Sequence, residues 1–305
     1  MTLRDLEYIC AVADRRHFGK AAGACHVGQP TLSSQIHKLE EHLGVVLFER
    51  TKRTVRLTPV GAEIVELARA TLQDAERIEQ TARAHRDPES GRLRLGLIPT
   101  IAPYLIPRFL APLGRRFPRL RAILQEDVTE ALLGRLRAGE LDAAILATRP
   151  ADTALRSLPL YREPFWAALP RGHRLTKLES VAPAALERGE LLLLTDGHCL
   201  KDQALAVCGL EAAAAGADTR AASLETILNL VGAGHGVTLV PALVLRDLRF
   251  RELRLVARRF EAPDAERTVR LVYRSGYPHE PLLARIAAVI RRCVPVSLIR
   301  PAAAN

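Results

Sequence analysis

Strand-like and helix-like segments alternate regularly from Gly91 onward, and this pattern limits the possible folds of the chain most strongly. The first run reads RLRLGLIPT as a strand, YLIPRFLAPLGRRF as a helix, LRAILQEDV as a strand, TEALLGRLRAGE as a helix and LDAAILAT as a strand. Alternation of this kind is typical of the α/β class and predicts a parallel sheet with helices on its faces.

A second α/β unit follows from about residue 151, with FWAALP, ELLLLTD and GVTLVPALVL as its strand candidates. The strand RTVRLVYR and the helix LLARIAAVIRRC near the end of the chain are long enough to return to the first unit. We therefore expect two lobes in residues 91–305: lobe I from 91–150 and 265–305, and lobe II from 151–264. A cleft between two such lobes is a favoured place for a ligand.

The first 58 residues have the spacing of a small helical unit rather than of α/β structure. Two short helices joined by a tight turn, the second beginning QPTLSSQIHKLE, fit a helix-turn-helix, and VVLFERTKRTVRLTPVG after them suits a small hairpin. If the leucines and isoleucine of the second helix face the core, its short polar side chains are left for a DNA major groove: Gln29, Thr31, Ser34 and Gln35. The competing interpretation is a helical bundle with a solvated polar face.

Residues 59–86 read as one long helix with a single apolar stripe formed by Val60, Ile64, Leu67, Thr71 and Ile78. A lone helix of this length needs a packing partner to be stable. A second copy of the same stripe would serve, which predicts a dimer. The alternative is that the stripe packs back on its own domain.

Composition narrows the class of protein without identifying it. The chain has 305 residues, a formal charge of +10 and five cysteines, and charges interrupt its first segment, MTLRDLEYICAVADRRHF. We expect no signal peptide, no membrane span, no disulfide framework and a cytoplasmic location. The positive charge favours polyanionic partners only weakly.

Two cysteines nine positions apart, Cys199 and Cys208, stand out in the segment GHCLKDQALAVC. The pair lacks the short chelating spacing of zinc ligands, so inert burial and redox chemistry are the stronger interpretations. If LKDQALAVC is helical, the two Cα atoms lie about 13 Å apart, whereas a disulfide needs roughly 4.4–6.8 Å. A disulfide could then form only if this segment at least partly unwinds.

The segment LRDLEYICAVADRRHFGKAAGACHVGQPTLSSQIHKLEEHLGVVLFERTKRTVRLTPVG resembles the winged helix-turn-helix of LysR-type transcriptional regulators. The long helix and the two α/β lobes are also similar to that family's architecture. Within the family, LIPTIAPYL, DGHCLKDQ, Cys208, SLETILNLVGAGHGVTLVPAL and RTVRLVYR resemble the hydrogen peroxide sensors. The resemblance implies a winged helix-turn-helix in 1–58, a linker and dimerisation helix with a hinge in 59–90, and a periplasmic-binding-protein-like regulatory domain in 91–305.

The resemblance also implies which side chains meet promoter DNA. One departure is Gly28, where the family usually has a serine that could cap the helix and touch a phosphate. With the polar face of the second helix, the expected DNA-binding residues are Arg4, Gln29, Pro30, Thr31, Ser33, Ser34, Gln35, Arg50 and Arg53.

For the cysteines, the resemblance implies that a Cys199 thiolate attacks peroxide to give a sulfenic acid, which Cys208 resolves to a disulfide. A helix amino terminus would help to stabilise the thiolate. We expect Asp202 to organise hydrogen bonds and His198 to line the loop. The expected peroxide pocket is Thr100, Thr129, His198, Asp202 and Arg267.

The expected function is therefore a peroxide-sensing activator of antioxidant genes, without enzymatic turnover, cofactor or metal. Expected partners are promoter DNA, hydrogen peroxide, further copies of the chain in a dimer or tetramer, RNA polymerase and cellular thiol reductants. Two alternatives stay open. One is a LysR-type regulator that binds a small organic anion in the cleft between the lobes, and the other is a thiol peroxidase with an added DNA-binding domain.

Overall fold

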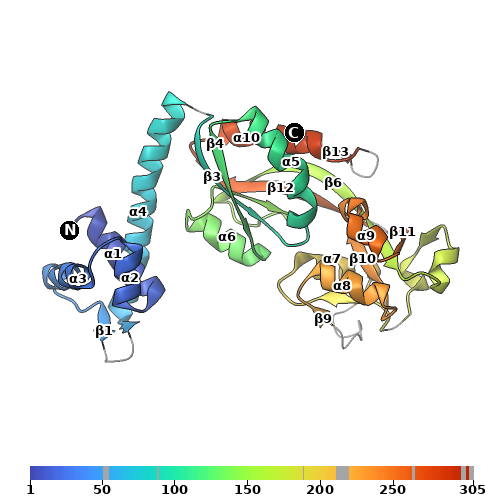
Figure 1. Cartoon of the computed structure of the whole chain (residues 1–305), viewed down its shortest axis with the longest axis horizontal. Helices are drawn as coiled ribbons and strands as arrows, with labels where there is room; N and C mark the ends of the chain where they lie inside the picture. Colours follow the sequence, from blue (N-terminus) through green and yellow to red (C-terminus); the bar gives the residue numbers. More distant parts are fainter. Residues whose placement is uncertain are drawn as a thin grey trace. The chain divides into compact units, whose positions relative to one another are not determined.

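The computed structural model describes residues 1–50, 55–87, 89–187, 189–210, 220–262, 265–296 and 300–301 (Figure 1). The chain divides into two compact units, Met1–Arg86 and Asp87–Asn305. The first unit has one hydrophobic core, and the second has two.

The first unit is a helix-turn-helix followed by a hairpin and a long helix. Its elements are α1 (Leu3–Arg15), α2 (Phe18–Ala24), α3 (Gln29–Leu43), β1 (Phe48–Arg50), β2 (Val55–Leu57) and α4 (Pro59–Arg86). The apolar side chains of α3, Leu32, Ile36 and Leu39, are buried as their spacing predicts. The α3 helix ends at Gly44, which adopts the left-handed backbone that favours glycine.

The buried carboxylate of Glu40 attaches the hairpin to α3. Its Oε1 atom accepts hydrogen bonds from the backbone N–H groups of Leu47, at 2.8 Å, and Phe48, at 3.2 Å. Two backbone donors that would otherwise be buried without partners are thereby satisfied, which fixes where β1 begins.

The predicted single stripe on α4 is wrong in detail. Among the described side chains of α4, Val65 and Ala68 are buried in the core of the first unit, and Ile64 and Leu72 pack beside them. Leu67 and Ile78 are 68% and 72% exposed. The first half of α4 therefore packs on its own unit, but through Val65 and Ala68 rather than through the predicted stripe. A second, narrower apolar row faces outward.

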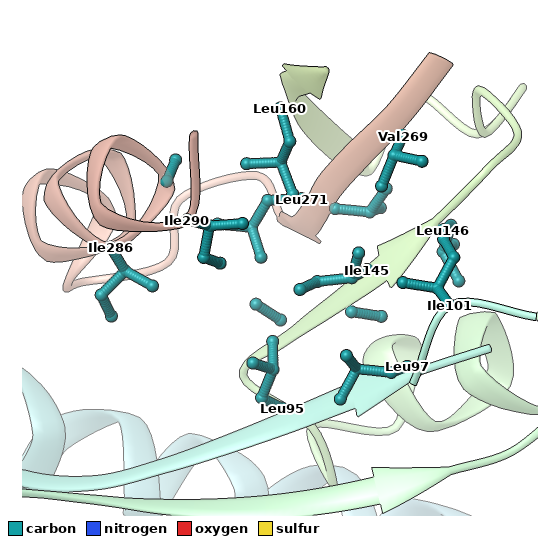
Figure 2. Close-up of a cluster of buried hydrophobic side chains, with 14 of the residues drawn as sticks. Leu95, Leu97, Ile101, Ile145, Leu146, Leu160, Val269, Leu271, Ile286 and Ile290 are labelled. Carbon is teal, nitrogen blue, oxygen red and sulfur yellow. The ribbon is translucent and has the colours of Figure 1, made fainter. Parts of the chain in front are cut away.

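The first core of the second unit lies on a sheet covered by helices. Its elements are β3 (Gly91–Leu97), α5 (Ala102–Arg116), β4 (Leu120–Glu126), α6 (Thr129–Arg137), β5 (Ala143–Leu146), β12 (Glu266–Arg274) and α10 (Glu280–Cys293). In Figure 1, α5 and α10 lie side by side, consistent with their contacts. Leucine, isoleucine and valine side chains from these strands and from α10 meet in the interior, among them Leu95, Ile145, Val269, Leu271 and Ile286 (Figure 2).

The sheet is mixed, which corrects the prediction of a parallel one. Strand β3 pairs in parallel with β4 and β5, but β12 pairs antiparallel with β5 and with β6 (Leu155–Leu169). In β6 the chain passes from the first core to the second, and in β12 it returns to the first, so these two strands run in opposite directions. Segment alternation alone does not reveal such crossings.

The second core contains shorter elements than the sequence suggests. They are η1 (Arg174–Lys177), β7 (Ser180–Val181), η2 (Pro183–Ala185), β8 (Leu193–Leu194), α7 (Cys199–Cys208), β9 (Arg220–Ala221), α8 (Leu224–Gly232), β10 (Thr238–Pro241), η3 (Ala242–Arg246), α9 (Leu248–Glu252) and β11 (Val256–Phe260). The run GVTLVPALVL is a strand only to Pro241, where η3 follows. A proline cannot donate to a strand ladder, which accounts for this stop. A last short strand, β13 (Arg300–Pro301), pairs with β6.

Among the residues that the structure describes, no helix is both long and apolar enough to cross a bilayer.

We predict that Gly61→Ala destabilises the first unit by about 1–3 kcal/mol, because overpacking a filled site costs this much. An added Cβ at Gly61, near the start of α4, would lie 2.2 Å from the backbone oxygen of Leu47. Thermal unfolding of the full chain measures the effect. Gly23→Ala is the matched control, since nothing lies within 4 Å of a Cβ there. Equal unfolding temperatures for the two variants would contradict the prediction.

Candidate functional site

The two cysteines occupy opposite ends of one helix. Helix α7 begins at Cys199, ends at Cys208, and is followed by Gly209 in the left-handed conformation. Both side chains are free thiols. Nine steps of helical rise place their Cα atoms about 13 Å apart, so the predicted separation applies to this conformation.

The two thiols belong to different cores of the second unit. Cys208 is buried in the second core with Leu200, Ala204 and Leu205, whereas Cys199 packs at the edge of the first core. The side chain of Gln203 also reaches the first core, because its Nε2 atom donates to the backbone oxygen of Ala147 at 2.9 Å. Helix α7 therefore bridges the two cores.

Arg267, a predicted pocket residue, is a buried cation whose side chain is 1% exposed. It lies on β12, and its Nη1 and Nη2 atoms donate to Oγ1 and to the backbone oxygen of Thr100, at 3.0 and 3.2 Å. Thr100 follows β3 and is itself buried. The structure thus brings these two predicted pocket residues together.

Sequence reasoning missed Glu163, the counter-ion of Arg267. Glu163 has no exposed surface, and its Oε1 atom accepts from Nε of Arg267 at 2.9 Å and lies 2.8 Å from Nη2. Its other oxygen, Oε2, accepts from the backbone N–H of Leu243 at 3.0 Å. The two residues are opposite each other in the β6–β12 pairing, and this register cannot be predicted from the sequence. The acidic residue in YREPFW, between aromatic side chains, was the one available signal.

Thr129, at the start of α6, completes the surroundings of Cys199. Its hydroxyl is buried and lies close enough to lower the pKa of the Cys199 thiol. A hydroxyl placed in this way is available to a small polar ligand beside the sulfur.

Burial raises the pKa of Cys199 above its ordinary value, and this is the largest effect on that thiol. The charge of Arg267 and the hydroxyl of Thr129 lower the pKa, while Asp202 raises it. We expected surroundings that favour the thiolate. In the resting structure the net effect is the opposite, and the neutral thiol is favoured. Burial raises the pKa of Cys208 to about 11, so this thiol is inert where it lies.

Asp202 and His198, two predicted pocket residues, lie at the amino end of α7. Asp202 is exposed and makes no hydrogen bond among the described residues, so the predicted organising role finds no support in its contacts. His198 precedes α7 and gives the helix no side-chain cap. Lys201, which sequence reasoning did not single out, is buried and paired with Asp196.

A cavity of about 560 Å³ lies between the two cores, next to the end of β3. Its walls include apolar side chains such as Pro103, Leu224 and Leu228. Its acidic lining residues outnumber its single arginine, Arg249: Glu126, Glu225, Asp247 and Glu252. A negatively charged lining disfavours an anionic ligand.

The candidate DNA-binding surface is the outer face of α3. Gln29, Pro30, Thr31 and Ser34 are exposed there, and Ser33 and Gln35 are half-buried. Gly28 forms the cap position of α3 without a side-chain hydrogen bond. This arrangement leaves short polar groups at the amino end of a helix, where base edges and phosphates are bound in helix-turn-helix proteins.

The three predicted DNA-binding arginines differ in their surroundings. The guanidinium of Arg4 donates to the Tyr8 hydroxyl, to Glu7 and to the backbone oxygen of Cys25, so it braces the turn before α3. Arg50 ends strand β1. Arg53 lies outside the described residues.

Comparison with known families gives two matches that together span most of the chain. The family described as "Bacterial regulatory helix-turn-helix protein, lysR family" matches residues 3–62. The "LysR substrate binding domain" matches residues 86–294.

Curated relatives and solved structures agree with this assignment. A hydrogen peroxide-inducible genes activator of Dickeya chrysanthemi and the DNA-binding transcriptional dual regulator OxyR of Escherichia coli K12 are each 43% identical, over 95% of this chain and 95% of theirs. A full-length OxyR mutant from Pseudomonas aeruginosa is 38% identical with a TM-score of 0.77, covering 96% of this chain and 99% of its own. A hydrogen-peroxide-bound OxyR mutant from Corynebacterium glutamicum is 35% identical with a TM-score of 0.65, covering 96% of this chain and 92% of its own.

We predict that Thr129→Val raises the pKa of Cys199, because the hydroxyl that lowers it is lost. The rate of Cys199 alkylation by iodoacetamide at pH 8 should fall by about threefold, the value of one modest hydrogen bond. Peptide-level mass spectrometry over a pH series measures this rate. Thr238→Val is the control, since it removes a buried hydroxyl bonded to Leu192 rather than one at the thiol. An unchanged midpoint in Thr129→Val would refute the assignment.

Proposed function

Since this chain belongs to the LysR family of transcriptional regulators, and within it to the OxyR group of peroxide-responsive activators, we propose that Cys199 and Cys208 form its peroxide-driven switch. The observation that carries the proposal is the placement of two free thiols at the two ends of α7, with the first beside Arg267 and Thr129.

The first step is nucleophilic attack by the Cys199 thiolate on one oxygen of hydrogen peroxide. The O–O bond breaks, the sulfur becomes a sulfenic acid, and the leaving hydroxide takes up a proton to form water. Thr129 is placed to hydrogen-bond the peroxide because its buried hydroxyl lies beside the Cys199 thiol. Arg267 would stabilise the negative charge that develops on the sulfur and on the leaving oxygen.

In the second step, the Cys208 sulfur attacks the sulfenic acid, releases a second water and forms a disulfide. The net change is two thiols and one peroxide to one disulfide and two waters. The Cα atoms start about 13 Å apart and must approach to roughly 4.4–6.8 Å, so α7 must unwind and Cys208 must leave the second core. The covalent bond thereby converts a chemical signal into a change of fold.

The change of fold would reach DNA through the association of subunits. We propose that the exposed row of α4, with Leu67 and Ile78, packs on a second copy of the chain. The outer face of α3 would bind promoter DNA in the major groove. Tetramer formation, contact with RNA polymerase, a cytoplasmic location, and re-reduction by cellular thiol systems belong to the same proposal.

The organic-anion alternative gains no support from the cavity between the cores. Four carboxylates line it against one arginine, which is unfavourable for an anion. Arg267, the cation that such a ligand would need, is already paired with Glu163.

We predict that one equivalent of hydrogen peroxide removes two free thiols from the wild-type chain and links the peptides of Cys199 and Cys208. Cys199→Ser should lose no thiols, because the attacking sulfur is absent. Cys208→Ser should stop at a sulfenic acid that a dimedone reagent traps. Thiol titration and peptide mapping by mass spectrometry give the readout, with DNA footprints recorded before and after treatment.

Cys293→Ser is the matched control for this prediction, since that thiol ends another helix, α10. It should cross-link like the wild type. Sustained consumption of many equivalents of peroxide with a recycling reductant would contradict a sensor and favour the peroxidase alternative.

A further inference from the structure

The charge of Arg267 is already engaged before any thiolate forms. Glu163 and Arg267 are both almost completely buried, at 0% and 3% exposure, and are joined by contacts of 2.8 and 2.9 Å. A cation that has a permanent anionic partner attracts a second anion less strongly, because part of its field is cancelled.

We propose that Glu163 is a positioning residue that acts on Cys199 through Arg267, as a resting counter-ion that competes with the thiolate and thereby limits how readily the sensor reacts. This inference rests on the proposed role of Cys199. It adds Glu163, which sequence reasoning did not identify, as the residue that determines how much positive charge the thiol experiences.

The geometry shows why Glu163 cannot simply be displaced. Its Oε1 atom contacts Arg267, and its Oε2 atom accepts from the backbone N–H of Leu243. Glu163 is part of strand β6, and its carboxylate is fixed by the hydrogen bond from the first turn of η3. The same contacts orient the guanidinium so that Nη1 reaches the Thr100 hydroxyl.

Several other groups share this environment. The charge of Arg267 lowers the pKa of Tyr104 on α5 and of Tyr161 on β6. The charge of Glu163 raises the pKa of Tyr161. Around Cys199 the groups that matter are Arg267 on β12, Thr129 on α6 and Asp202 on α7. Both tyrosine hydroxyls have raised pKa values, which keep them neutral near pH 7. Asp247, Glu126 and Arg249 also act on Tyr104, and Arg108 acts on Tyr161. Glu163 is the carboxylate that contacts Arg267 directly.

The test is the pH dependence of Cys199 alkylation by iodoacetamide in a Cys208→Ser background. In Glu163→Gln the uncompensated Arg267 should lower the midpoint by about one pH unit or more, the size of effect that an adjacent opposite charge produces. Thiolate becomes about tenfold more abundant at pH 7, but its nucleophilicity falls with its pKa, so alkylation should rise about threefold. An unmoved or raised midpoint overturns the inference.

Action through Arg267 is tested by the double variant. In an Arg267→Met background, Glu163→Gln should produce no further shift, because the charge that it modulates is absent. A shift of equal size in both backgrounds overturns the inference. Asp142→Asn is the matched control: it removes another buried carboxylate from another arginine, Arg94, and should leave the Cys199 midpoint unchanged. A shift of the same size in Asp142→Asn also overturns the inference.

If Glu163→Gln does not fold, Glu163→Asp keeps the charge and withdraws it by one methylene. A smaller downward shift is expected there, and no shift or an upward shift overturns the inference. Iodoacetamide replaces peroxide in all of these measurements. If peroxide leaves the wild-type thiols free, the proposed function fails, whereas the alkylation midpoints still judge the role of Glu163 separately.

Discussion

A helix of fixed rise keeps the sulfurs of Cys199 and Cys208 apart. Helix α7 spans Cys199 to Cys208 without interruption, so their separation is a property of the backbone rather than of side-chain rotamers. A cross-link cannot form by small adjustments, because disulfide geometry tolerates only a narrow range of Cα distances. In the proposed mechanism, formation of the disulfide and unfolding of α7 are therefore coupled.

This constraint has consequences because α7 is attached to both cores of the second unit. Leu200, Ala204 and Leu205 hold it in the second core, while Cys199 and the hydrogen bond from Gln203 to Ala147 hold it to the first. Unwinding of α7 would expose its apolar side chains and break the hydrogen bond to Ala147, so the helix is favoured in the reduced protein. In the proposed mechanism, formation of the disulfide offsets this loss of stability. Burial raises the pKa of both thiols, which suits a switch that should stay off in the absence of peroxide.

Much of this arrangement could be predicted from the sequence. Periodicity was sufficient for α3, α4 and the first βαβ run, and the flanks of the cysteines were sufficient to place them on one helix. Long-range pairing was not predictable: the antiparallel course of β6 and β12 brings Glu163 opposite Arg267, and no local pattern encodes that register. Glu40 was missed for the same reason, since its partners lie on the hairpin. Asp202, which the resemblance placed in the pocket, has an exposed side chain and lies close enough to Cys199 to raise the pKa of its thiol.

The central claim is that the disulfide between Cys199 and Cys208 requires α7 to unfold. Hydrogen–deuterium exchange of the backbone amides in residues 200–208 tests it most directly, comparing reduced protein with protein oxidised by one equivalent of peroxide. Cys208→Ser, treated identically, serves as the reference for oxidation without a cross-link. The account predicts slow exchange in the reduced and Cys208→Ser proteins and fast exchange in the cross-linked protein. Equal protection in cross-linked and reduced protein would contradict it.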